Sequence, residues 1–208
     1  MENRQKVIQE EEQENLDWPA LSKYKKDNHE LKLKSNSGKR IVFMGDSITE
    51  GWSGIYPDFF QNKNYINRGI SGQTTPQMLI RFRADVVDLN PSIVIILAGT
   101  NDIAENTGPS NVKMITDNIF SMSELAMAHK IKVILCSILP VYTYSWKDIP
   151  DPPSYIAEVN NMLKNYCVNH NLQYVDYFSS MANEKRVNKK SNSRERQSGT
   201  GSNVRKAS

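Results

Sequence analysis

Short apolar runs rich in Val and Ile alternate along the chain with segments of helical period. Between the runs, apolar residues recur every three or four positions, as in helices that bury one face. The runs occupy residues 41–44, 65–70, 93–98, 133–139 and 174–178. Three helices are indicated, and their inward positions are Leu79, Phe82 and Val86; Val112, Ile115, Ile119, Met122 and Ala126; and Ile156, Val159, Leu163 and Tyr166. Thr75 and Pro76 should open the first of these helices.

This alternation predicts an α/β fold built on a five-stranded parallel sheet. Parallel neighbours need a crossover connection, which a helix usually supplies. The strands read as nearly continuous apolar runs because helices cover both faces of such a sheet. Open parallel sheets bind their ligands beyond the carboxyl ends of the strands. The residues that directly follow each run are therefore the candidates for chemistry.

The chain has 208 residues, of which 38% are hydrophobic, enough for one domain with a core of its own. Residues 1–38 are charged and lysine-rich, and we expect an N-terminal helical arm whose helix starts at Asp17-Trp18-Pro19. Residues 39–183 should form the α/β domain. Residues 184–208 are polar and basic, a composition typical of disorder.

Charge and apolar content exclude several classes of protein. From Lys185 onward there are eight basic residues and one acidic residue, so the net charge of +3 comes from this tail. A basic excess confined to a polar tail gives little support for a nucleic-acid-binding fold. No apolar run approaches the ~18 residues that span a membrane. No secretory signal follows Met1, so we expect a cytoplasmic protein unless a signal was removed.

The two cysteines, Cys136 and Cys167, form neither a disulfide framework nor a metal-ligand pattern. We expect both to be packed thiols, because free cysteine is usually buried. A flavodoxin-like nucleotide- or flavin-binding protein is the natural rival on fold alone. The chain contains no glycine-rich phosphate fingerprint, so the residues argue against that rival.

Three loops carry candidate catalytic groups. Ser47 follows the first run in a short turn that leads into a helix, where a serine hydroxyl can act as a nucleophile. Gly72 follows the second run, and a glycine there can turn its backbone N–H toward an oxyanion. Asn101 follows the third run and offers a neutral amide donor. Taken singly, each has a plainer interpretation, a helix cap for Ser47 and turn or cap residues for the other two.

The loop after the fourth run, residues 141–153, is rich in Tyr, Trp and Pro. It is a candidate wall or lid for an organic substrate, although surface packing would explain the same composition.

Together the three motifs resemble the first three sequence blocks of the SGNH (GDSL) hydrolases, over roughly residues 17–183. The motifs are Gly-Asp-Ser-Ile-Thr at 45–49, Ser-Gly-Gln-Thr-Thr at 71–75 and Gly-Thr-Asn-Asp at 99–102. The resemblance implies a flavodoxin-like three-layer α/β/α sandwich and an esterase or lipase-type acyl hydrolase of small-molecule esters, with no cofactor and no metal. It also implies that Ser47 is the nucleophile, and that Ser47, Gly72 and Asn101 form the oxyanion hole.

The chain departs from the family in its last block. The resemblance places an Asp-x-x-His motif, which supplies the base and its orienting carboxylate, after the fifth strand and before a closing helix. That loop should begin near Ser179, but neither the motif nor a histidine follows, and we expect the closing helix to be missing. His29, His129 and His170 do not fit the motif, and the last two should lie at helix ends. Two functions stay open: an esterase of impaired activity, or an inactive module that binds acylated ligands.

Overall fold

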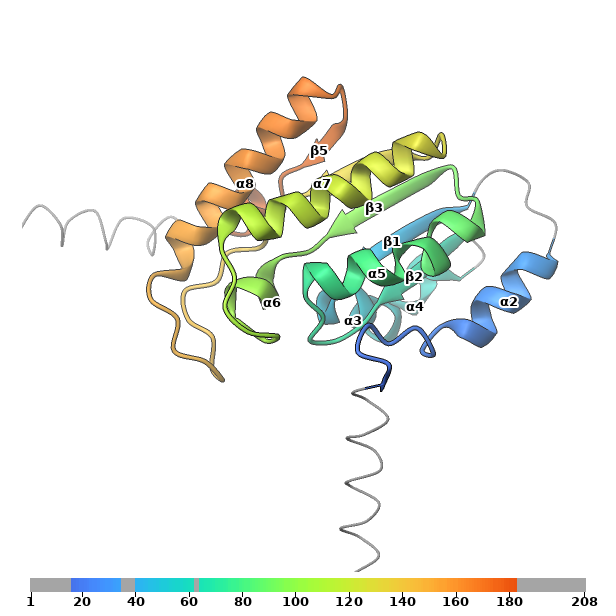
Figure 1. The fold of residues 1–208 in the computed structure, drawn as a ribbon, viewed down its shortest axis with the longest axis horizontal. Helices are drawn as coiled ribbons and strands as arrows, with labels where there is room; N and C mark the ends of the chain where they lie inside the picture. The colour runs from blue at the N-terminus through green and yellow to red at the C-terminus, as the bar shows by residue number, and fades with distance from the viewer. Residues whose placement is uncertain (1–15, 35–39, 62–63, 183–208) are drawn as a thin grey trace, which may run out of the picture.

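The computed structural model describes residues 16–34, 40–61 and 64–182 (Figure 1). The start of the predicted arm and the predicted disordered tail at 184–208 lie outside the described residues. The expected loss of a closing helix concerns the same C-terminal stretch and also lies outside them.

Five strands form one parallel sheet, as predicted. They are β1 (Ile41–Gly45), β2 (Tyr65–Gly69), β3 (Ile93–Leu97), β4 (Lys132–Cys136) and β5 (Gln173–Val175). Their spatial order is β2-β1-β3-β4-β5, which is the flavodoxin-like order. The register pairs Gly45 with Gly69 on one side and with Leu97 on the other. The carboxyl ends of β2, β1 and β3 therefore finish level, at one edge of the sheet.

Helices cover both faces of the sheet and complete the three-layer sandwich. The helices α5 (Thr75–Asp85), α7 (Val112–Ala128) and α8 (Pro152–Asn169) pack side by side in front of the sheet (Figure 1). On the other face lie α3 (Ser47–Ile55) and α4 (Pro57–Phe60), because right-handed crossovers in opposite directions along the sheet use opposite faces. The three helices predicted from the apolar period are confirmed.

The main core lies between the sheet and the row of α5, α7 and α8. Alternate strand residues point into it, and Val42, Met44, Val94 and Leu135 are fully buried. The predicted inward positions of the three helices are buried too, with Leu79 only partly so. This burial is the main stabilising contribution to the fold.

The other face holds an aromatic cluster. The ring of Phe43 on β1 lies 5.4 to 5.9 Å from those of Trp52, Phe59 and Phe60, mostly edge to face. Such edge-to-face pairs favour contact between the positive rim of one ring and the negative face of the next. The cluster fixes α3 and α4 against β1, and so it fixes the turn in which Ser47 lies.

Three predicted boundaries are wrong, one in the arm and two in the sheet. The arm's helix, α2 (Lys25–Leu33), begins eight residues after Asp17. The Asp17 carboxylate accepts the N–H groups of Leu21 and Ser22, and Ala20 has a φ of 56°, so the chain turns there instead.

The fifth strand ends at Val175, three residues before its predicted end. Asp176 caps a short helix, α9 (Tyr177–Met181), by accepting the N–H and the hydroxyl of Ser179. Ser179 therefore lies in a helix and does not begin a loop. The fourth strand is likewise shorter than its apolar run, because the chain leaves the sheet after Cys136.

Two further short elements lie in the described ranges, the 3-10 helix η1 (Val87–Leu89) and the helix α6 (Thr100–Ile103). Both cysteines are free and buried, as predicted. No helix in the described ranges combines the length and the apolar character needed to cross a bilayer.

Candidate active site

Ser47 is the first residue of α3 and is exposed at the carboxyl edge of β1. The helix is capped by its neighbour, because the Asp46 carboxylate accepts the N–H of Ile48 at 3.0 Å. The cap interpretation of Ser47 is therefore wrong. The turn before it requires glycine, since a Cβ on Gly45 would lie 2.1 Å from Oγ1 of Thr49. The result is a solvent-exposed serine directly after the end of the strand.

Gly72 lies in the loop between β2 and α5 with a φ of +77°, a conformation that favours glycine. The loop is tied to α3, because Glu50 accepts the N–H of Ser71 at 2.7 Å and its hydroxyl at 2.5 Å. The capping box of Thr74 and Gln77 then starts α5. Gly72 thus sits in a turn, as the plainer interpretation expects, and that turn is fastened to the helix of Ser47.

Asn101 is in α6, with only 4% of its surface exposed. Its Nδ2 donates to the carbonyl of Gln73 at 2.9 Å, so the side chain bonds to the neighbouring loop and not to its own turn. Its neighbour Asp102 accepts the N–H of Thr75 at 3.0 Å and the Thr75 hydroxyl at 2.6 Å. An amide nitrogen carries two hydrogens, so Asn101 has a second N–H to offer.

The carboxylate of Asp46 is buried beneath this edge, with 1% of the residue exposed. Oδ1 is bonded to Ile48, whereas Oδ2 has no hydrogen-bond partner among the described residues. Burial, together with the nearby carboxylate of Asp102, raises the pKa of Asp46 to about 6. Burial also raises the pKa of Asp102. Negative charge is therefore unfavourable below the loop of Ser47.

None of the chain's three histidines reaches this edge. His29 is exposed on α2. His129 and His170 cap the C-termini of α7 and α8, with Nδ1 against the carbonyls of Leu125 and Tyr166. The helices run antiparallel to the strands, so both rings lie at the opposite edge of the sheet, as predicted. In the part of the chain that the structure describes, no cluster of His, Cys, Asp or Glu could hold a metal ion.

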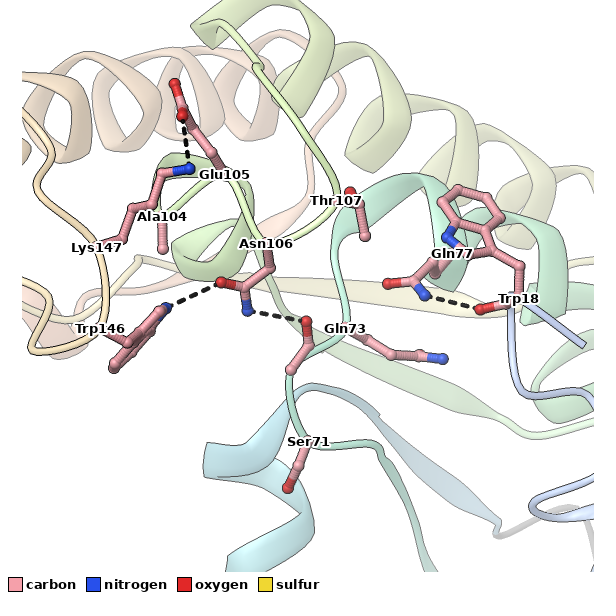
Figure 2. Close-up of a pocket in the computed structure, with 11 residues that line it drawn as sticks. Trp18, Ser71, Gln73, Gln77, Ala104, Glu105, Asn106, Thr107, Trp146 and Lys147 are labelled. Atoms are coloured by element: carbon pink, nitrogen blue, oxygen red, sulfur yellow. Dashed lines mark hydrogen bonds and ion pairs between the residues drawn. The ribbon is translucent and has the colours of Figure 1, made fainter. Parts of the chain in front are cut away.

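A cavity of about 570 Å³ opens beside Gly72 (Figure 2). The predicted wall at residues 141–153 supplies Trp146 and Lys147, while Tyr144 is buried behind them with its hydroxyl 3.1 Å from that of Thr100. Pro152 and Pro153 do not belong to this wall, because they form the first turn of α8. The arm supplies Trp18, which was not among the predicted site residues because no local pattern in the sequence indicates where the arm docks.

Comparisons with known proteins agree with the fold and with the family that the sequence resembles. The profile of the GDSL-like lipase/acylhydrolase family matches residues 43–193. A crystal structure of a GDSL-like lipase from Bacteroides thetaiotaomicron VPI-5482 shares 46% identity and a TM-score of 0.77, covering 80% of this chain and 82% of that one. A crystal structure from Bacteroides fragilis NCTC 9343, described as a candidate acylhydrolase, shares 49% identity and a TM-score of 0.77 over 80% of each chain.

Among curated proteins, an arylesterase from Vibrio mimicus is 28% identical over 120 residues, which cover 52% of this chain and 58% of the relative. The chain spans about half the length of the curated relatives it matches. The family profile covers well over half of the chain and includes all three candidate loops. The chain therefore belongs to the GDSL-like lipase/acylhydrolase family.

Proposed function

We propose that this protein hydrolyses a carboxylic ester of a small molecule, with Ser47 as the nucleophile. The hydroxyl oxygen of Ser47 would attack the ester carbonyl. The backbone N–H groups of Ser47 and Gly72 and the amide of Asn101 would donate to the oxyanion that forms. Such preorganised donors stabilise developing charge without having to rearrange.

One observation carries this proposal: the three loops are bonded to one another. Glu50 joins the helix of Ser47 to the loop of Gly72, and Asn101 joins that loop to α6. Loops fastened in this way hold a nucleophile and its donors in a fixed relation, which is what acyl transfer requires.

The base is where the chain differs from a full Ser-His-Asp triad. A serine hydroxyl is a weak nucleophile until a base takes its proton. With every histidine away from the edge, catalysis would rest on the oxyanion donors and on substrate binding. In triad enzymes that lose their base, these contributions leave a rate about 10³–10⁴-fold above that of the reaction in water. We therefore propose a slow esterase. The second candidate function, a module that binds acylated ligands without turnover, is favoured by the same placement of the histidines.

Hydrolysis of p-nitrophenyl acetate by the purified chain tests the proposal. Wild type should exceed the background rate, and Ser47→Ala should abolish that excess. Ser121→Ala is the matched control, since Ser121 is an exposed serine on α7. Equal rates in wild type and Ser47→Ala would overturn the esterase. Thermal stabilisation by an acylated ligand without product release would then identify the binding module.

A further inference from the structure

The cavity beside Gly72 has walls of an unusual kind for an enzyme of lipid esters. Its lining consists of two tryptophans, three amides, two hydroxyls, one ion pair and two small residues. These residues are Trp18, Ser71, Gly72, Gln73, Gln77, Ala104, Glu105, Asn106, Thr107, Trp146 and Lys147. We propose that this cavity binds a neutral, polyhydroxylated group of the size of a sugar ring. The idea that this group is the alcohol part of the ester rests on the proposed function.

The lining does not suit a long acyl chain. Ala104 is the only aliphatic side chain among the described residues that line the cavity. Burying a methylene group contributes about 0.8 kcal/mol, but only where apolar atoms surround it. Polar walls offer a chain of methylenes no such surroundings.

The lining does not suit a charged group either. Its one acid and one base neutralise each other, with Nζ of Lys147 3.3 Å from Oε2 of Glu105. The remaining polar groups are uncharged amides and hydroxyls. A phosphate would lose its hydration without gaining a counter-charge.

The two tryptophans supply apolar faces of the right kind. Trp18 is 42% exposed and Trp146 is 63% exposed, and Figure 2 shows them on opposite sides of the cavity with Asn106 between them. Exposed large aromatic side chains at a cavity are typical of ligand sites. The C–H face of a sugar ring packs on an aromatic ring, while its hydroxyls point outward to hydrogen-bond.

The side-chain amides of Gln77 and Asn106 are oriented by hydrogen bonds and can bind such hydroxyls. Nε2 of Gln77 donates to the carbonyl of Trp18 at 2.7 Å, and Nδ2 of Asn106 donates to that of Gly72 at 3.1 Å. Trp146 donates its indole N–H to Oδ1 of Asn106 at 3.0 Å. The bonds to the two carbonyls each use one of the two hydrogens of an amide, the bond from Trp146 uses the oxygen of Asn106, and together they fix the orientation of both amides. The second N–H of each amide can then meet a ligand.

The same contacts place the cavity next to the proposed chemistry. Asn106 bonds to the carbonyl of Gly72, whose N–H is the proposed oxyanion donor. A ring seated between Trp18 and Trp146 would therefore carry its ester group toward the edge of Ser47. The adjacency makes the cavity a site for one part of the ester, and its polar lining is why we assign it to the alcohol part and not to the acyl part.

Binding can be measured without catalysis, in the Ser47→Ala variant. The chain has three tryptophans, so its ¹H–¹⁵N spectrum has three indole signals. Titration with methyl β-D-xyloside and methyl β-D-glucoside should shift the signals of Trp18 and Trp146 in a saturable way. Trp52, packed among the rings on the other face, is the internal control and should not move. Trp146→Ala should weaken the affinity about tenfold, the equivalent of 1.4 kcal/mol.

Other outcomes overturn the inference. Octanoate or phosphocholine could shift the two signals where the glycosides do not, or no probe could shift them up to its solubility limit. Either result would contradict the proposal that the cavity binds a sugar-like ligand. Failure of the proposed function looks different: glycosides bind, but wild type does not hydrolyse p-nitrophenyl acetate. Hydrolysis without glycoside binding would leave the esterase standing and remove this inference alone.

Discussion

Asn28 of the N-terminal arm and Asp85 of α5 are joined by a buried hydrogen bond, with Nδ2 and Oδ1 2.6 Å apart. Oδ1 of Asn28 also accepts from the guanidinium of Arg68, at 3.0 Å from Nε and 2.8 Å from Nη2. Arg81, fully buried, pairs with the other oxygen of Asp85 at 2.8 Å and donates to the side chain of Gln73 at 2.5 Å. Through these contacts the arm is bonded to the strand end and to the loop of the candidate site.

Removing the Asn28 side chain should therefore destabilise the protein. In Asn28→Ala, two buried charged groups lose a partner, and we expect the free energy of unfolding to fall by about 3 kcal/mol. Urea denaturation measures it. Lys26→Ala, an exposed change on the same helix, is the control and should stay within about 0.5 kcal/mol of wild type. A loss in Asn28→Ala no larger than in the control would show that the arm is not held through this residue.

Because α3 packs closely on β2, we expect a side chain at Gly69 to destabilise the protein. A Cβ on Gly69 would lie 2.1 Å from the backbone nitrogen of Glu50 and 2.7 Å from the carbonyl of Asp46. Backbone atoms cannot move aside cheaply, so Gly69→Ala should cost about 3 kcal/mol or more. It should also displace the turn of Ser47 and lower any esterase activity.

Gly54 is the matched control for Gly69. It lies in α3 with no atom within 4 Å of a built Cβ, so Gly54→Ala should leave stability unchanged or raise it by up to about 1 kcal/mol. Thermal unfolding of both variants compares the two sites. Similar melting temperatures would contradict the close approach of α3 to β2.

The elements that the sequence predicts best are those whose signal is local. Each apolar run and each helical period is decided by residues within one element, and the three loops follow directly from the strand ends. Asn28 shows what local patterns miss. It lies in a lysine-rich segment that looks solvated, yet its partners are 40 and 57 positions away. Trp18 could not be predicted as a cavity residue for the same reason, because the arm docks through residues far away in the sequence and no local periodicity indicates this.

The predicted boundaries of helices and strands are wrong where a single polar side chain outweighs the apolar pattern. Tyr177 and Phe178 continue the apolar run of the fifth strand, but the carboxylate of Asp176 satisfies the N–H of Ser179 and starts a helix. The same preference of Asp for caps and turns operates at Asp17 and Asp46. An Asp followed three residues later by Ser was available as a signal in the sequence.

The two thiols should be unreactive in the native protein. Burial raises the pKa of Cys136 to about 12 and that of Cys167 to about 11, and the thiolate is the reactive form. At pH 8, Ellman's reagent should label neither thiol of the folded chain and both in urea. Rapid labelling of one thiol without denaturant would contradict their burial.

Asp46 should make stability depend on pH. Its pKa is raised from 3.8 to about 6, so the native state holds this proton more tightly than the unfolded chain does. The contribution of Asp46 is therefore full below about pH 4 and is lost as the pH rises through about 6. Asp46→Asn cannot ionise, and it keeps an oxygen to cap α3. The stability of this variant relative to wild type should rise across this window by up to about 3 kcal/mol.

Denaturation at a series of pH values measures this difference, with the exposed Asp148→Asn as control. Carboxylates whose pKa values are lowered, such as Asp176, change the stability of wild type and of both variants by the same amount at each pH. Their contributions therefore cancel in the comparison. Asp102 lies close enough to raise the pKa of Asp46, so part of its own titration will change in Asp46→Asn. If the difference in stability between Asp46→Asn and wild type stays constant from pH 4 to 7, ionisation of Asp46 does not destabilise the native state. Oδ2 of Asp46, which has no hydrogen-bond partner among the described residues, would then have to be solvated beneath the loop of Ser47.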